Sequence, residues 1–495
     1  MYDKKPYICR NFHAKNADVV AIVVIILVYF AVLLLLSSCM GTRGNDAFFR
    51  GNRQSPWPIV AFGMIGASVS GVTFVSVPGM PMRVDMTYLQ MCMGFVVGYL
   101  VVAFVLLPLY YRAGLTSIYG YLGDRFGRTS RKTGAWFFLL SKLAGSAAKF
   151  YLVCLILQQV LHVPFVAIVI AALLMVWLYT RRSGIRVLVW TDALQTFCML
   201  MALVLMMVEV TSRMGLSPSE ACRMVWTDAH SRVFEWTDWS SPQHFVKQFV
   251  SGIFVVIVMT GLDQDMMQKN LTCRSLRAGQ KNLCSYGVMF IPVNLLFLAL
   301  GVLFIHFYAR CGVELPQSGD ELVPQMVFSG ELSPFVTVCF AIGVIAAAFS
   351  SADSALTALT TSFCIDILNM EDKQTQTERK VRLRHWVHVG MTLVFVLFVL
   401  AFKWIGSQSV IDLIYTLVGY TYGPLLGLFA FGLLNCRLPR ERWVPFVAVA
   451  APVLCYVVDH VAQWAWGYRF GYELLLLNGL LTYAGLYGCS LKAKS

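Results

Sequence analysis

Apolar runs long enough to cross a bilayer recur along the whole chain and constrain its fold more than any other feature of the sequence. A transmembrane helix needs about 20 mostly apolar residues, and roughly thirteen such runs can be counted. They lie near residues 18–39, 57–79, 88–111, 133–160, 163–180, 187–211, 245–263, 283–308, 332–368, 385–404, 409–434, 443–461 and 471–489. The 495 residues are 58% hydrophobic and only 13% charged, and the connections are short. The sequence therefore predicts an all-α integral membrane protein, with residues 1–495 forming a single transmembrane domain.

Lysines and arginines gather in every second connection between these runs. The basic connections follow the first, third, fifth, seventh, ninth and eleventh runs, and Lys269 is counted in the one after the seventh. By the positive-inside rule, this pattern places the N-terminus outside and the C-terminus in the cytoplasm, with a bacterial inner membrane as the expected location. The basic residues within 4–15 favour the opposite orientation, but they are outnumbered by the basic residues of the other connections. The net charge of +13 thus reflects membrane topology, and no nucleic-acid partner is expected.

The stretch 341–368 is apolar enough to span a membrane, yet it carries a cluster of hydroxyls and a carboxylate. Its residues Ala347, Ser350, Ser351 and Ser354 stand at i, i+3, i+4 and i+7, which is one face of a helix. Two hydroxyls and a backbone carbonyl on one face offer neutral oxygens to a small, hard cation. Close helix packing by small residues is the alternative explanation for the same pattern.

Two of the predicted spans are interrupted by glycine and small polar residues. The span 57–79 has Gly66, Ser70 and Gly71 in its middle, and 245–263 has two glycine-containing soft points. Transporters use helices broken at membrane depth to hold ions and substrates with freed backbone groups. The two spans are five apart, which is the position expected for matching helices of an inverted repeat.

Charged residues also fall inside predicted spans. Asp192 lies early in 187–211, and Lys142 and Lys149 lie in 133–160. Intramembrane charges are rare unless they pair, bind a cation or face a water-filled path. A position at the membrane interface, with the ammonium extending to the surface, is open for Lys142. A salt bridge between Asp353 and one of these lysines and an ion-binding role for the carboxylates are also open explanations.

Four segments together resemble the sodium:solute symporter family. They read NDAFFRGNRQSPWPIVAFGMIGASVSGVTF, LVWTDALQ, DQDMMQKNL and AAAFSSADSALTALTTSFCIDI. The resemblance covers nearly the whole chain and implies a LeuT-type five-plus-five inverted repeat. It places the core repeats at about 57–211 and 245–434, with extra helices at about 18–39, 443–461 and 471–489.

The resemblance also implies site residues, while Asn52-Arg53 departs from the usual Gly-Arg pair. The family's shared sodium site maps onto Gly66, Val69, Ala347, Ser350 and Ser351. A second sodium site, found in some members, maps onto Asp192, Asp353 and Ser354. The substrate is expected beside Ser68, Ser70, Thr73, Gln90 and Lys149. Lys149 stands where members that carry sialic acid have an arginine.

The expected function is sodium-coupled import of a small organic solute by alternating access, with Na⁺ as coupling ion and the lipid bilayer as surroundings. A Lys149 ammonium that faces the cavity favours an anionic solute such as sialic acid or another sugar acid. The alternative is that Lys149 pairs with Asp353 or Asp192, or extends to the membrane surface, and does not meet the substrate. A proton-coupled or uncoupled carrier of the same fold is the nearest alternative. A membrane enzyme built on His385 and His388, or a sensor, is a more distant one, and no catalytic residue is expected. The sequence leaves the oligomeric state open.

Overall fold

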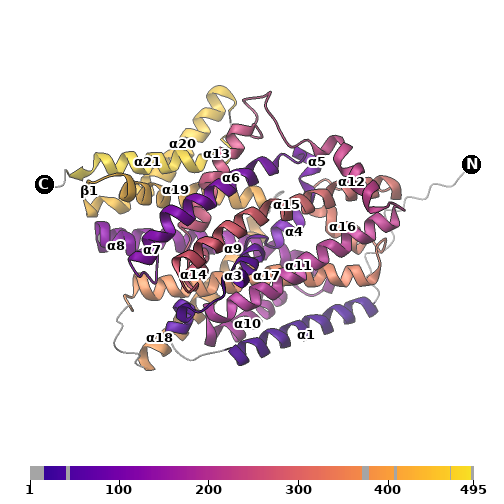
Figure 1. The fold of residues 1–495 in the computed structure, drawn as a ribbon, viewed down its shortest axis with the longest axis horizontal. Helices are drawn as coiled ribbons and strands as arrows, with labels where there is room; N and C mark the ends of the chain where they lie inside the picture. Colours follow the sequence, from indigo (N-terminus) through magenta and orange to yellow (C-terminus); the bar gives the residue numbers. More distant parts are fainter. Residues whose placement is uncertain (1–15, 41–44, 371–377, 406–409, 469, 492–495) are drawn as a thin grey trace, which may run out of the picture.

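The chain folds almost entirely into α-helices (Figure 1). In this computed structural model the described residues are 16–40, 45–370, 378–405, 410–468 and 470–491. The longer helices are α1 (Asn16–Met40), α3 (Trp57–Ser68), α4 (Gly71–Gly79), α6 (Tyr88–Val101), α9 (Arg128–Leu161), α10 (Phe165–Ser183), α11 (Ile185–Arg213), α13 (Phe245–Val256), α15 (Leu276–Cys311), α17 (Pro334–Ser362), α18 (Glu378–Ile405), α19 (Val410–Leu434), α20 (Val444–Trp466) and α21 (Leu474–Gly488).

Shorter helices and helical turns connect or extend these elements. They are α2 (Asn45–Arg50), η2 (Gly51–Arg53), α5 (Pro81–Val84), η3 (Val102–Leu106), α7 (Leu107–Arg112), α8 (Gly120–Phe126), α12 (Pro218–Thr227), η4 (Ala229–Ser231), η5 (Ile257–Gly261), α14 (Gln264–Leu271), η6 (Gly319–Glu321), α16 (Leu322–Phe328), η7 (Phe363–Ile367) and η8 (Glu441–Trp443). Two short strands, β1 (Leu438–Pro439) and β2 (Ser490–Leu491), pair antiparallel and tie the segment after α19 to the one after α21.

The described helices confirm that the chain is an integral membrane protein. Eight of them are long and apolar enough to cross a membrane, and two bent helix pairs raise the number to ten. Three shorter apolar helices lie within 26–39, 165–181 and 474–488. Each predicted run overlaps one of these helices or pairs. The number of crossings therefore remains a prediction, while the all-α membrane class is shown.

Burial separates central helices from peripheral ones. The most apolar part of α17 is 72% buried, whereas the corresponding parts of α18 and α20 are 22% buried. α17 packs against α11 and α9, and α11 packs against α3. α20 and α21 lie against α19 at one edge of the molecule, and α1 lies at another edge beside α10 and α17 (Figure 1). The polar stretch of α17 is therefore at the centre of the bundle, where hydroxyls and carboxylates avoid lipid.

The first predicted break lies between α3 and α4, which are bent by 58°. The Ser70 amide bonds the Ser68 carbonyl at 2.9 Å, so it does not close a helical bond to the Gly66 carbonyl four residues back. The first bond of α4 runs from the Phe74 amide to the Ser70 carbonyl. The carbonyls of Gly66 and Val69 at the break are thereby released from the helical pattern.

The second break lies between η5 and α14, where the chain bends by 65°. Asp263 caps α14, because its carboxylate accepts hydrogen bonds from the backbone amides of Asp265 (2.8 Å) and Met266 (3.3 Å). Every residue of α14 is buried. The prediction that Lys269 belongs to a basic inner loop is therefore wrong, since Lys269 lies in a buried helix.

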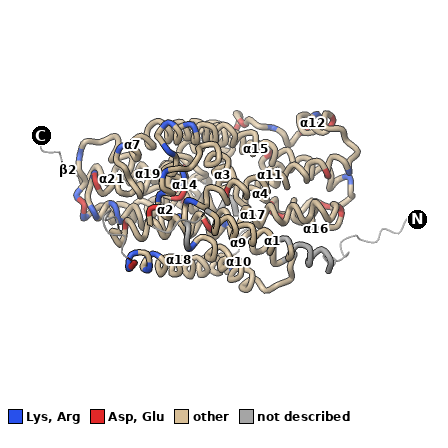
Figure 2. The backbone as a smooth tube through the Cα atoms, turned by 60° about the horizontal axis from the view of Figure 1, so that its bottom comes forward, with Lys and Arg blue, Asp and Glu red and all other residues tan. Residues whose placement is uncertain are grey.

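The remaining basic residues gather mainly at one end of the bundle. Figure 2 shows many lysines and arginines, with a few acidic residues among them, around α7, α18 and β2, whereas fewer basic residues lie at the opposite end near α12. The two bent pairs, α3–α4 and α13–α14, lie in the positions predicted for matching helices of a repeat. The repeat boundaries themselves, 57–211 and 245–434, stay a prediction.

Candidate functional site

A cavity of ≈ 130 Å³ lies between the two broken helices. The break of α3–α4 contributes Ser68, Ser70 and Thr73 to its wall, and α9 contributes Lys142 and Lys149. Asp263 and residues of α6, α13, η5, α14, α15 and α19 complete the lining. The structure thus brings together four of the five residues predicted to meet substrate, in the kind of concave site where transporters hold their solutes.

The hydroxyls of the first break differ in how they are used. Ser68 forms a hydrogen bond with the Tyr286 hydroxyl, which also accepts a bond from Tyr99 at 2.8 Å. Ser70 and Thr73 line the cavity and make no side-chain hydrogen bond to the described residues. The Ser70 and Thr73 hydroxyls are therefore the groups at the break that remain available to a solute.

Lys142 forms ion pairs with two carboxylates at the second break. Its ammonium lies 3.2 Å from Asp263 Oδ2 and 2.7 Å from Asp265 Oδ2. Tyr422 on α19 also donates to Asp263 Oδ2, at 2.5 Å. A lysine held between two carboxylates carries no uncompensated charge toward the cavity. This arrangement replaces both positions that the sequence suggested for Lys142, one at the membrane interface and one paired with Asp353.

Lys149 lies two helical turns after Lys142 on α9 and also lines the cavity. No ion pair joins it to any residue in the described part of the chain. The pairing of Lys149 with Asp192 or Asp353, one of the two alternatives drawn from the sequence, is not present. Lys149 is thus the cation of the cavity wall that lacks a carboxylate partner among the described residues.

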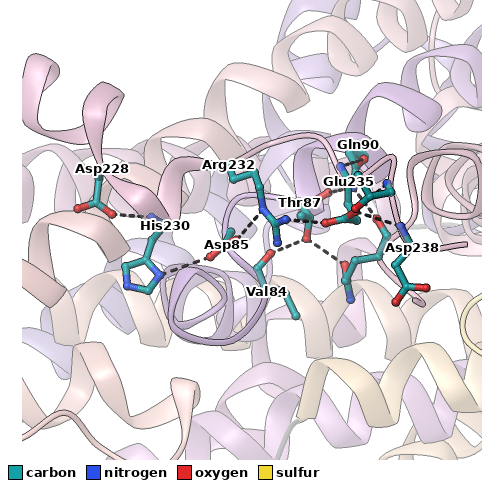
Figure 3. A network of polar contacts seen from close by, with 11 residues as sticks. Val84, Asp85, Thr87, Gln90, Asp228, His230, Arg232, Glu235 and Asp238 are labelled. Atoms are coloured by element: carbon teal, nitrogen blue, oxygen red, sulfur yellow. Dashed lines mark hydrogen bonds and ion pairs between the residues drawn. The ribbon is translucent and has the colours of Figure 1, made fainter. Parts of the chain in front are cut away.

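Gln90 is the predicted substrate residue that the structure does not bring to the cavity. It belongs instead to the polar network drawn in Figure 3. Its amide nitrogen donates to the carbonyls of Gln243 (2.9 Å) and Thr87 (3.2 Å), and its oxygen accepts from the Glu235 amide (3.1 Å). The side chain is completely buried. Gln90 therefore fastens the segment 228–244 to the start of α6.

The backbone half of the expected sodium site lies at the break of α3. The carbonyls of Gly66 and Val69 are released there, as described above. A Cβ built on Gly66 would overlap Thr196 Oγ1 and come within 3.0 Å of Thr196 Cβ, so α11 packs directly on this glycine. Ala347 of α17 lies close by, since a Cβ built on Gly71 would come within 3.8 Å of its Cβ. The break and α17 thus meet where the resemblance places the cation.

The hydroxyl half of that site comes from α17. Ser350 donates a hydrogen bond to Asp192 Oδ1 at 2.8 Å, which leaves oxygen lone pairs free. The Ser351 hydroxyl is buried and has no hydrogen-bond partner among the described residues. A buried hydroxyl without a partner is unfavourable by itself and fits a position that an ion completes.

The structure does not leave all three residues expected at the second sodium site, Asp192, Asp353 and Ser354, as free oxygen ligands. Asp192 Oδ2 lies 2.8 Å from the Lys269 ammonium, and both side chains are 1% exposed. Asp353 accepts a hydrogen bond from Tyr179 at 2.6 Å through Oδ2, while its other oxygen has no partner among the described residues. The Ser354 hydroxyl is buried and likewise without a described partner.

Sequence reasoning missed Lys269 as a site residue. The available signal was the spacing of Asp265 and Lys269, four residues apart with Met266 and Met267 between them, which is the pattern of one helical turn. His388, considered above as part of a membrane enzyme, is instead buried, with its ring nitrogens 3.0 Å and 2.9 Å from the hydroxyls of Thr180 and Thr360.

Comparison with known proteins agrees with this geometry. The sequence model of the Sodium:solute symporter family matches residues 48–441, which is most of the chain. The chain therefore belongs to the sodium:solute symporter family, and Na⁺ is the coupling ion that this membership indicates. It is a transporter and not an enzyme.

Two curated relatives and one solved structure illustrate the similarity. The human sodium/iodide cotransporter is 24% identical over 83% of this chain, and the match spans 66% of the cotransporter's length. The sodium/sialic acid symporter NanT of Aliivibrio fischeri is 25% identical, covering 78% of this chain and 77% of its own. A substrate-bound outward-open structure of a Na⁺-coupled sialic acid symporter superimposes with a TM-score of 0.78 at 20% identity, covering 96% of this chain and 97% of the other. This last comparison shows that the two proteins share a fold, which is the LeuT-like architecture predicted from the sequence.

Proposed function

We propose that this chain imports a small organic anion together with sodium, and that the substrate carboxylate binds the Lys149 ammonium. The observation that carries the proposal is the contrast between the two lysines of α9. Lys142 is neutralised by Asp263 and Asp265, whereas Lys149 lines the same cavity without an ion pair in the described chain. A buried ammonium is stabilised by a counter-charge, and a bound carboxylate provides one.

The hydroxyls at the first break would orient the rest of the solute. Ser70 and Thr73 line the cavity with side chains that bond no other described residue. Hydroxyls that both donate and accept hydrogen bonds suit a polyhydroxylated acid. Sialic acid or another sugar acid is therefore the first substrate class to test. The named substrates of two relatives, iodide and sialic acid, are both anions, which agrees with an unpaired cationic group, Lys149, in the cavity wall.

Sodium would bind between the carbonyls of Gly66, Val69 and Ala347 and the hydroxyls of Ser350 and Ser351. Such an ion joins α3 to α17 and favours the arrangement of the bundle that accepts substrate. We place the N-terminus outside and the C-terminus in the cytoplasm of a bacterial inner membrane, following the charge pattern of the connections. Each sodium ion crossing a potential of about 100 mV then contributes roughly 2.3 kcal/mol to accumulation.

Thermal stability and uptake test the proposal directly. Purified protein is screened against sialic acid, other sugar acids, monocarboxylates and neutral sugars, with and without sodium, because a ligand that binds the folded state raises its melting temperature. Uptake of the responding solute into proteoliposomes should require a sodium gradient. Uptake driven equally by a proton gradient in the absence of sodium would support the proton-coupled alternative.

Variants of Lys149 then test its role. Lys149→Gln should abolish the shift caused by the anion, and Lys149→Arg should retain part of it because the charge remains. Lys281→Gln, which changes an exposed lysine of α15, serves as the control and should behave as the wild type. Normal transport by Lys149→Gln, or an uncharged natural substrate, contradicts the proposal.

A further inference from the structure

A buried ion pair lies next to the candidate sodium ligands and joins α14 to α11. The Lys269 ammonium is 2.8 Å from Asp192 Oδ2 and 3.7 Å from Asp265 Oδ1. The other oxygen of Asp192 accepts the Ser350 hydroxyl at 2.8 Å. Both oxygens of the Asp192 carboxylate are therefore engaged, one of them by a cation that belongs to the chain.

The bend before α14 holds the ammonium in this position. Asp263 caps the helix, and α14 turns by 65° away from α13 and η5. Lys269 follows Asp265 by four residues and so lies on the same face of α14. The Lys269 side chain is 1% exposed and cannot reach the membrane surface, as a lysine near a helix end does.

The electrostatic requirement at Asp192 can be met in two ways. A carboxylate buried at membrane depth needs a positive charge beside it. A sodium ion and a lysine ammonium carry the same charge, and a carboxylate accepts either. They differ in transport, because sodium can leave on the other side of the membrane whereas the ammonium stays with the chain.

We propose that the Lys269 ammonium takes the place of a second sodium ion at Asp192, so that each transport cycle uses only the sodium held between α3 and α17. This inference rests on the proposed sodium site of Ser350 and Ser351, and it deepens the proposed function by fixing the number of ions moved. It also gives Lys269 a role at the first site. The ammonium holds Asp192, and Asp192 holds the Ser350 hydroxyl, which orients the remaining lone pairs of that serine.

Equilibrium binding of ²²Na⁺ to purified full-length protein tests this without any substrate. The wild type should bind one sodium ion per chain with a Hill coefficient of about one. Lys269→Gln leaves Asp192 without its ammonium and should bind a second sodium ion. The double variant Lys269→Gln/Asp192→Asn removes both charges and should return to one. Lys281→Gln is the control for the loss of a lysine and should also bind one.

The possible results separate this inference from the proposed function. A wild-type count of two that falls to one in Asp192→Asn overturns the inference, because Asp192 then ligates sodium itself. A folded Lys269→Gln that still binds one sodium also overturns it. If Lys269→Gln does not fold, a wild-type count of one sodium ion that stays at one in Asp192→Asn supports the inference. A wild-type count of zero contradicts the proposed sodium coupling instead.

Discussion

The Ser350 hydroxyl donates a hydrogen bond to Asp192 Oδ1 across 2.8 Å, and this contact joins α17 to α11 beside the candidate sodium site. Because the proton of Ser350 points to the carboxylate, its oxygen lone pairs point elsewhere. The neighbouring Ser351 hydroxyl is buried without a described partner and is free to turn. The two serines therefore offer a sodium ion one oriented oxygen and one adaptable oxygen.

Removing either hydroxyl should weaken sodium binding. We expect Ser350→Ala and Ser351→Ala each to raise the sodium concentration for half-maximal uptake by about ten- to hundredfold, since a contact between a polar group and a charge is worth roughly 1.5–3 kcal/mol. Sodium titration of uptake in proteoliposomes measures the change. Ser38→Ala, on an exposed part of α1, is the control. Unchanged sodium dependence in both variants would show that the cation binds elsewhere.

Much of the fold could be predicted because its signals are local in the chain. Runs of apolar residues predict the spans, and the glycines around Ser70 predict the first break, since such residues weaken a helix wherever it lies. Ala347, Ser350 and Ser351 could be selected as one face of a single helix from spacing alone. The structure places that face at the centre of the bundle, against the break.

The partners of the charged residues could not be predicted in the same way. Lys269 follows Asp263 and Asp265 in a polar stretch, which resembles a loop until the cap at Asp263 and the 65° bend are known. Its contact with Asp192 joins residues far apart in the sequence. The partners of Gln90 could not be predicted for a similar reason, because the segment that contains Glu235 returns from a distant part of the chain to bind it.

The glycine at the first break should be intolerant of a side chain. A Cβ on Gly66 would overlap Thr196 Oγ1 and lie 3.0 Å from Thr196 Cβ, so Gly66→Ala has to push α3 away from α11. We expect a loss of about 1–3 kcal/mol in stability, as for other overpacked sites, together with weaker sodium binding because the Gly66 carbonyl moves. Thermal denaturation and ²²Na⁺ binding measure the two effects.

Two further variants test the cause of that loss. Thr196→Ala removes the atom closest to the new methyl group and should partly rescue Gly66→Ala in both measurements. Gly390→Ala on α18 adds a methyl group with no atom of another element within 4 Å and should lower neither the stability nor sodium binding. If Gly66→Ala has the same effect in the wild type and in Thr196→Ala, the contact of residue 66 with α11 is not the cause of the loss.

The segment 228–244 is held by a set of ion pairs and hydrogen bonds around Arg232 (Figure 3). Arg232 Nε lies 3.0 Å from Asp85 Oδ2, and its terminal nitrogen lies 2.6 Å from Glu235 Oε2. The backbone amide of Thr237 donates to Glu235 Oε1 at 2.9 Å. The hydrogen bonds from Thr237 lower the pKa of Glu235 from its ordinary value, and Arg232 acts in the same direction.

Because the pKa of Glu235 is lowered, the stability of the folded segment 228–244 should depend on pH. The ionised form of Glu235 is favoured in the folded segment, so its contribution is complete above the ordinary pKa of about 4.3 and is lost as the pH falls through the lower folded value. We therefore expect backbone amide exchange in 228–244, corrected for the intrinsic effect of pH, to be constant from about pH 7 to 5. It should accelerate below about pH 4.

Glu235→Gln should exchange faster at neutral pH and lose this acid-dependent step, whereas Glu314→Gln, at an exposed position, should keep it. Exchange in Glu235→Gln that retains the wild-type step would mean that another group controls the segment.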